Sequence, residues 1–140
     1  MRKRLIFIGP LPGEVNGQNL VTKKILDQFN ESGVDLRVVD TSTSVNSIPL
    51  KKLYCHIRAC LAVLFFSGDV YLSLNSNQGL WLSLLVATIA RIRGKKVGVH
   101  HHAFSPIRHK SHAMTLLVKV IARKGFHIVL AQTQFDHLLP

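Results

Sequence analysis

Short apolar runs alternate along the chain with longer segments in which apolar residues recur every three or four positions. The short runs predict strands at Arg4–Ile8, Asp35–Asp40, Asp69–Leu74, Lys95–His102 and His127–Ala131. Each lies between turn-forming residues, and the runs are too apolar to leave one face in water. This is the pattern of strands buried on both faces of a parallel sheet.

The segments between these strands have helical periodicity. In Gly17–Ser32, the residues Val21, Ile25 and Phe29 share one face, and Gly33 is a typical C-terminal stop. Further helices are predicted from Pro49 to about Phe66, from about Gln78 to Arg93 with Gly94 after it, over Ser111–Lys124 with Gly125 after it, and from Thr133 onward. The second of these is almost entirely apolar, which predicts burial on most of its sides.

Strand and helix therefore alternate along the whole chain. This order predicts an α/β fold: a Rossmann-like parallel sheet with right-handed crossovers and helices on both faces. The 140 residues suffice for one domain with one core, and neither an internal repeat nor a linker is visible, so residues 1–140 are expected to form one domain.

Composition adds a strong positive charge to this picture. Apolar residues make up 47% and charged residues 18%, which excludes a disordered chain, but the net charge is +11. Such a charge suits nucleic acid, an anionic membrane or a phosphorylated ligand. Many of the cations follow predicted helices, where they face the negative end of the helix dipole. No aromatic residues interleave with the basic ones, which argues against nucleic acid.

The location predicted from the sequence is cytoplasmic. Cys55 and Cys60 have no zinc or redox spacing and are interpreted as buried thiols in a reducing compartment. The apolar run Leu5–Ile8 is too short for a signal core, and Ala59–Phe66 and Gly79–Ala90 are too short for a membrane span.

In an open parallel sheet, ligands bind beyond the carboxyl ends of the strands. This rule selects the loop after the first strand, Asn75–Asn77, His100–His102 and Gln132-Thr133. The first loop has neither the dinucleotide fingerprint nor a P-loop, but Gly17 begins a helix, where free backbone N–H groups favour an anion. An ordinary strand-to-helix turn explains this loop equally well.

The run His100-His101-His102 is the second candidate feature. Because side chains alternate along a strand, His100 and His102 share a face and His101 points away, so three adjacent histidines do not make one metal site. For His102, at the strand end, we favour a polar ligand contact over a structural role. His100 suits either role, and His101 is expected to be structural. No metal or cofactor is predicted.

At these residues the chain resembles a known family. GPLPGEVNGQNLVTKKILDQF, followed later by DVYLSLNSNQGLWLSLLVATIARIRGKKVGVHHHAF, resembles the N-terminal domain of family-four retaining glycosyltransferases, which have the GT-B fold. His100 and His102 occupy the two histidine positions of a His-x-His-Gly-like element, and Ala103 stands where glycine is usual. Gly17 occupies the position of a loop glycine that contacts the donor diphosphate or the acceptor.

The resemblance implies a two-domain enzyme that moves a sugar from a nucleotide diphosphate sugar to a hydroxyl acceptor, a glycan or a lipid-linked saccharide, with retention. Residues 1–140 would be its acceptor-side domain, and the nucleotide-binding half, with an E-x7-E element, would be absent, so these residues alone are expected to be inactive. His102 would be the catalytic residue that holds the donor sugar or the acceptor. The substrate-binding residues would be Asn16, Gly17, Gln18, His100, Asn75, Asn77 and Arg108, although the last three also suit helix-capping or solvated roles.

Two alternatives to this interpretation stay open. One is a non-catalytic Rossmann-like ligand-binding module; the other is an oxidoreductase or nucleotide-binding domain, against which the missing fingerprint argues. A separate hypothesis concerns Lys51, Lys52 and Arg58 beside Leu61–Phe66, which suit peripheral contact with the inner face of an anionic membrane. Core packing of a Rossmann helix explains the same segment.

Overall fold

The computed structural model describes residues 3–11, 17–42, 49–74, 79–102, 111–122, 125–129 and 136. Its strands are β1 (Arg4–Gly9), β2 (Asp35–Asp40), β3 (Asp69–Ser73), β4 (Val97–His100) and β5 (Gly125–Ile128), and its helices are α1 (Gly17–Glu31), α2 (Pro49–Phe65), α3 (Gly79–Ile92) and α5 (His112–Ile121). The five strands are all parallel and lie in the order β2-β1-β3-β4-β5. The chain therefore has the Rossmann-like α/β fold that its pattern predicts.

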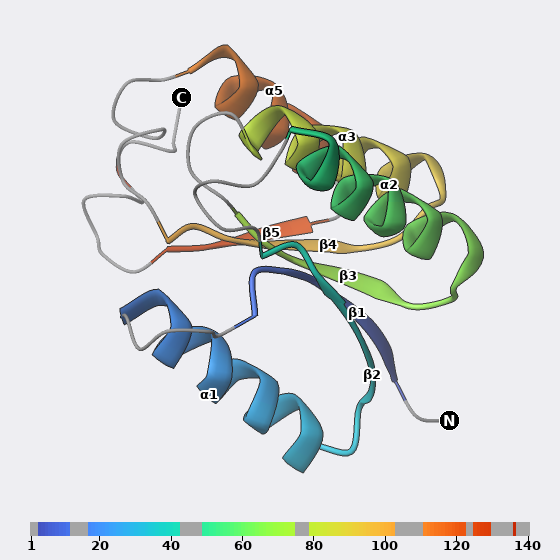
Figure 1. The fold of residues 1–140 in the computed structure, drawn as a ribbon, viewed down its shortest axis with the longest axis vertical. Coiled ribbons are helices and arrows are strands. Elements are labelled where there is room, and N and C mark those ends of the chain that lie inside the picture. The colour runs from blue at the N-terminus through green and yellow to red at the C-terminus, as the bar shows by residue number, and fades with distance from the viewer. Residues whose placement is uncertain are drawn as a thin grey trace.

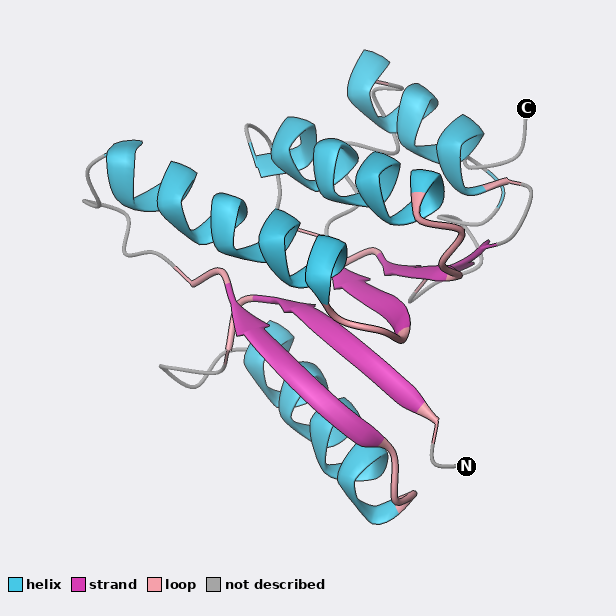
Figure 2. Ribbon diagram, turned by 90° about the vertical axis from the view of Figure 1, so that its right-hand side faces the viewer, coloured by secondary structure: helices cyan, strands magenta, loops and turns pink. Residues whose placement is uncertain are grey.

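Helices cover both faces of the sheet, as predicted. Helix α1 lies on one face, below the sheet in Figure 1, and α2, α3 and α5 form a layer on the other. Figure 2, turned by a quarter, shows the same separation, with α1 beneath β1 and β2. Because β1 has β2 on one side and β3 on the other, the direction of strand addition reverses between β1 and β3.

The main core lies between the sheet and the three-helix layer. From the strands it takes the side chains that alternate onto this face: Ile6, Ile8, Val70, Leu72, Val97 and Val99. The helices contribute Ala59, Val63, Val86, Ala87, Ala90, Met114, Leu117 and Ile121. Each large aliphatic side chain buried here stabilises the fold by about 1.5–3 kcal/mol.

A smaller aromatic cluster joins the sheet to α1. Phe7 and Tyr71 stack with their ring centroids 5.5 Å apart, and Phe29 of α1 meets Tyr71 edge-on, also at 5.5 Å. Phe29 belongs to the apolar face that the sequence predicted for this helix.

The glycines that follow α1 and α3 end these helices, as predicted. Gly33 and Gly94 have φ values of 66° and 72°, the left-handed conformation that ends helices.

The final strand, predicted at 127–131, is observed as β5 at Gly125–Ile128, so Gly125 begins a strand and α5 ends earlier, at Ile121. A side chain at Gly125 would collide with Ile121 and with the Val97 carbonyl, so this strand needs a glycine where it enters the sheet. Strand β4 is also shorter than predicted and ends at His100.

Helix α3 is buried or half-buried over most of its circumference, as predicted, but it leaves one apolar face exposed. It buries Leu80, Val86, Ala87 and Ala90, but Trp81, Leu85 and Ile92 are exposed. The reason is its place in the layer: α3 packs between α2 and α5 on the sheet, and no described residue covers its outer face.

Two further sequence expectations concern the thiols and the membrane. Cys55 and Cys60 are both free; Cys55 is buried as expected, but Cys60 is only half-buried. Burial raises the pKa of the Cys60 thiol. Within the described ranges, no helix is long and apolar enough to cross a bilayer.

Candidate functional site at the carboxyl edge of the sheet

The carboxyl ends of β1, β3 and β4 lie at one edge of the sheet, and the strand order reverses between β1 and β3. Ligands of open α/β sheets usually bind at this edge, beside such a reversal. Gly9 ends β1 beside Ser73, the last residue of β3. A Cβ added to Gly9 would lie 2.5 Å from the Ser73 Cβ. Glycine at position 9 therefore lets Ser73 occupy its place at this edge.

His100 is held by Tyr71 on the neighbouring strand. The Tyr71 Oη lies 2.7 Å from the His100 Nδ1, and both side chains are buried. Burial raises the pKa of Tyr71, so the phenol keeps its proton at neutral pH. That proton has no other acceptor within the described part of the chain. We therefore infer that Tyr71 donates to Nδ1, which places the His100 ring proton on Nε2.

His102 is held by Ser73. Its Nε2 lies 2.9 Å from the Ser73 Oγ, and its ring lies against that of His100, with the centroids 4.0 Å apart. The two side chains therefore share a face, as the alternation of a strand predicts. His102 itself follows the end of β4, at the carboxyl edge of the sheet.

This pair has unused hydrogen-bonding capacity. Nε2 of His100 and Nδ1 of His102 are buried, and neither has a hydrogen-bond partner among the described residues. Burial lowers the pKa of His100, and burial together with the His100 imidazole lowers the pKa of His102 to about 4. Both rings are therefore neutral at pH 7. His100 offers a donor and His102 a donor or an acceptor, which suits a hydroxyl or phosphate oxygen.

His101 points to the opposite face, as predicted, and pairs with His127 of β5. The His101 Nε2 lies 2.8 Å from the His127 Nδ1, and the rings stack with centroids 5.1 Å apart. Burial, followed by the imidazoles of His127, His100 and His102, lowers the pKa of His101 to about 3. This pair lies on the face covered by the three-helix layer, in agreement with a structural role.

The other predicted site residues are only partly described. Gly17 is the first residue of α1, so the backbone N–H groups of that first turn face the carboxyl edge, and Gln18 follows it in the same turn. Asn16, Asn75, Asn77 and Arg108 lie outside the described residues, as does the side chain of Gln18. In the described ranges, no group of three or more His, Cys, Asp or Glu residues is placed to hold a metal ion.

Sequence reasoning missed the partners of the histidines: Tyr71, Ser73 and His127. A signal for the first two was present, because alternation in DVYLSL places Tyr71 and Ser73 on one face of β3. The parallel register then pairs Ser73 with His100. Nothing in the sequence says that β3 and β4 are neighbours, so the signal required the strand order.

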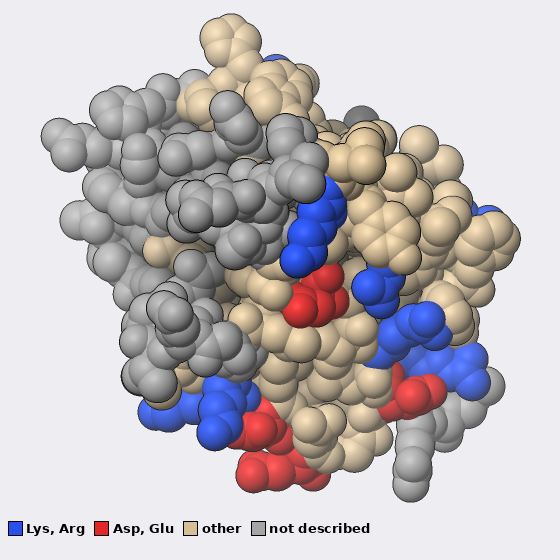
Figure 3. Space-filling view, in the orientation of Figure 1, with Lys and Arg blue, Asp and Glu red and all other residues tan. Residues whose placement is uncertain are grey.

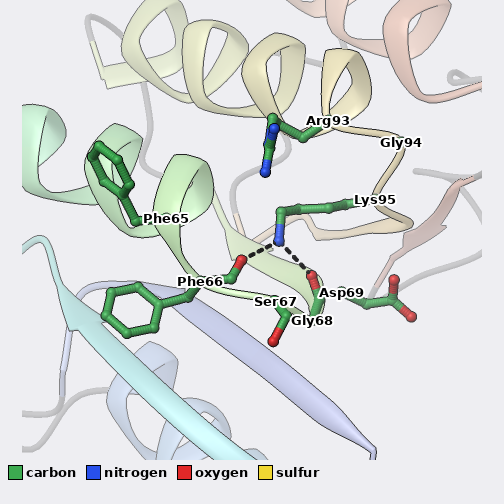
Figure 4. A pocket seen from close by; sticks show the side chains of 8 residues that line it. All are labelled: Phe65, Phe66, Ser67, Gly68, Asp69, Arg93, Gly94 and Lys95. Carbon is green, nitrogen blue, oxygen red and sulfur yellow. Dashed lines mark hydrogen bonds between the residues drawn. The ribbon is translucent and has the colours of Figure 1, made fainter.

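A hollow of about 430 Å³ lies at the opposite, amino-terminal edge. Figure 4 shows Lys95 reaching across it, where its ammonium donates hydrogen bonds to the carbonyl oxygens of Phe66 and Gly68. Burial and the nearby Arg93 lower the pKa of Lys95. These contacts join the turn between α2 and β3 to the start of β4. We interpret this cluster as structural, because its lysine is already hydrogen-bonded and ligands of such sheets bind at the other edge.

The chain matches no protein-family model, no curated protein and no solved structure. The assignment of a function therefore depends on the residues themselves.

Proposed function

We propose that this chain is the acceptor-side, N-terminal part of a family-four retaining glycosyltransferase of the GT-B fold. The whole enzyme would move a sugar from a nucleotide diphosphate sugar to a hydroxyl acceptor, a glycan or a lipid-linked saccharide. The observation that carries the proposal is a pair of ring nitrogens at the carboxyl edge of the sheet, His100 Nε2 and His102 Nδ1, which have no hydrogen-bond partner among the described residues. The sequence resemblance supports it by assigning ligand contacts to the same two histidines and to Gly17.

His102 acts in this proposal as a neutral hydrogen-bonding group. A histidine with a pKa of about 4 is uncharged at pH 7 and is a weak base, so proton transfer is not its main contribution. It instead orients the donor sugar or the acceptor hydroxyl, which lowers the barrier by positioning the reacting groups. Its ring is fixed for this purpose by Ser73 on one side and by the His100 ring on the other.

Gly17 contributes its place at the start of α1. Free N–H groups in a first helical turn, together with the positive end of the helix dipole, stabilise an anion such as a diphosphate. The sequence contains no Glu-x7-Glu element that could bind the rest of the nucleotide sugar. We therefore expect this chain alone to bind nucleotide sugars weakly and to show no transfer.

Histidine NMR tests the proposal directly. The chain, labelled with 13C at its histidines, is titrated to millimolar concentrations with UDP-glucose, GDP-mannose and, as acceptor probe, a methyl glucoside. We expect the signals of His100 and His102 to shift, and those of His101 and His127 to stay unchanged on the other face of the sheet. A His102→Gln variant should abolish the shift of His100, and His112→Gln, on an exposed histidine of α5, is the matched control.

Two outcomes would overturn the proposal. If none of the ligands shifts His100 or His102 even at millimolar concentrations, the carboxyl edge is not a sugar site. If the chain alone binds one of them with micromolar affinity, the two-domain interpretation is wrong and a self-sufficient ligand-binding module replaces it.

A further inference from the structure

Helix α2 presents an unusually apolar face outward. Seven large apolar side chains on it are exposed: Leu50, Leu53, Tyr54, Ile57, Leu61, Leu64 and Phe65. They recur every three or four residues, so they form one stripe over about a third of the helix circumference. The other face of the same helix buries Cys55, Ala59, Ala62 and Val63. Core packing therefore accounts for only one of its two apolar faces.

Helix α3 extends this surface. Its exposed Trp81, Leu85 and Ile92 also lie on one face, and α3 packs directly against α2. We call these two stripes together the apolar surface. Large contiguous apolar surfaces of this kind are rare on monomers and mark contacts with a protein or a membrane.

The charges around the apolar surface distinguish between these partners. The sequence has seven acidic residues, and none lies on α2, α3 or α5. Lys51 and Arg58 are exposed beside the α2 stripe, with the Arg58 guanidinium 6.0 Å from the Tyr54 ring centroid, and Arg93 is exposed just after α3. In Figure 3 the part of this view over α2 is tan and blue, and the red atoms lie over the lower half of the molecule.

A second copy of the chain does not fit this pattern, because two such surfaces would bring basic groups against basic groups. An anionic lipid surface fits both features: its acyl region accepts the apolar side chains, and its headgroups attract the flanking cations. We propose that α2 and α3 dock this domain on the surface of an anionic membrane, with both helices lying in the plane of the interface.

This inference stands independently of the proposed function, but it bears on the acceptor. In a parallel sheet each helix begins at the edge where the preceding strand ends, so the α2 stripe starts, at Leu50, near the carboxyl edge that holds His102. A docked domain thus holds its ligand edge close to the bilayer, where a lipid-linked saccharide is presented.

Vesicle binding tests the inference. We expect the chain to co-sediment at low salt with vesicles of phosphatidylcholine and phosphatidylglycerol, but not with phosphatidylcholine alone, and the binding to weaken as salt screens the charges. Trp81 is the sole tryptophan of the chain and belongs to the apolar surface, so its emission should move to shorter wavelength as it enters the lipid. This reporter ties binding to the proposed face.

Two variants distinguish membrane binding through the apolar surface from nonspecific adsorption to lipid. Leu53→Ser combined with Leu61→Ser should lower the partition coefficient about tenfold or more without unfolding the domain, because both side chains are exposed. Leu20→Ser is the matched control: Leu20 is 53% exposed and Leu53 is 48% exposed, but Leu20 lies on α1 in the other layer. The control should bind vesicles like the unaltered chain.

Three results would overturn the inference. The first is no pelleting with anionic vesicles at low salt, and the second is equal pelleting of the double variant and the control. The third is a concentration-dependent dimer in sedimentation velocity that the double variant abolishes, because the apolar surface would then be an interface between copies.

Discussion

His101 lies between His100 and His102 in the sequence, but the alternation of β4 puts it in different surroundings. His100 and His102 turn to the α1 face, where their partners are a phenol and a hydroxyl group of β3. His101 turns beneath the three-helix layer, where its partner is another histidine. Both pairs are neutral and retain unpartnered nitrogens within the described residues, but only the first is hydrogen-bonded to β3, one of the two strands between which the strand order reverses. Both pairs consist of histidines, so residue type does not separate a candidate site from a structural pair. Their position relative to the place where the strand order reverses does.

Acid should destabilise the domain through both pairs, and this is the largest effect we expect. The unfolded histidines bind protons near pH 6.5, but folding lowers the pKa of His102 to about 4 and of His101 to about 3. The unfolded state therefore binds more protons, so stability is full above about pH 6.5 and falls below it. Between about pH 6.5 and about pH 5 these two residues should cost about 3 kcal/mol.

Urea unfolding at both pH values measures this loss. His101→Gln and His102→Gln should each reduce it by about half. A free energy of unfolding that does not change over this interval would show that solvent reaches both pairs in the folded state.

Removing one imidazole ring from each pair should cost more folding stability where the ring is more deeply buried. His101→Ala should cost about 2–4 kcal/mol, since it empties a fully buried site and leaves His127 without its partner. His102→Ala should cost about 1–2 kcal/mol, because that ring is only half-buried. Urea denaturation at neutral pH compares the two, and an equal or reversed order would contradict the assignment of His101 as the structural member.

Gly9→Ala should disturb one pair and spare the other. The new methyl group would collide with Ser73, so we expect a loss of about 1–3 kcal/mol and a changed NMR signal for His102 but not for His101. Gly33→Ala is the control. It has φ of 66° and nothing within 4 Å of the added Cβ, so it should cost about 1–2 kcal/mol and leave every histidine signal in place. Shifts of both pairs in Gly9→Ala would mean that the pairs are coupled.

Tyr71→Phe gives the smallest expected effect. It removes the phenol that donates to the His100 Nδ1, at a cost of about 1 kcal/mol. The 15N shifts of the His100 ring should report a change of tautomer, because Nδ1 loses its donor. Retention of the original tautomer would show that something other than Tyr71 fixes it.

The five strands, the helices α1, α2, α3 and α5, and the shared face of His100 and His102 followed from residue periodicity, because alternation and helical spacing are local properties of the chain. The helix expected from Thr133 onward lies, apart from residue 136, outside the described residues. The start of the last strand and the exposed face of α3 were not predicted, in both cases for non-local reasons. The last strand begins at Gly125 because that residue must pass close to Ile121 and the Val97 carbonyl. The apolar α3 remains partly exposed because its neighbours in the layer are α2 and α5, and no described residue covers its outer face.

By itself, then, the sequence determined a parallel α/β fold, a candidate ligand edge and which histidines share a side of their strand. Only the tertiary structure decided that β3 lies between β1 and β4, which supplies Tyr71 and Ser73 as partners and sets Gly9 against Ser73. It also decided that an apolar surface on α2 and α3 faces outward. The physical reason is the same in both cases: periodicity records which side of its own element a residue occupies, whereas the order of strands and the neighbours of helices depend on contacts between segments far apart in the chain.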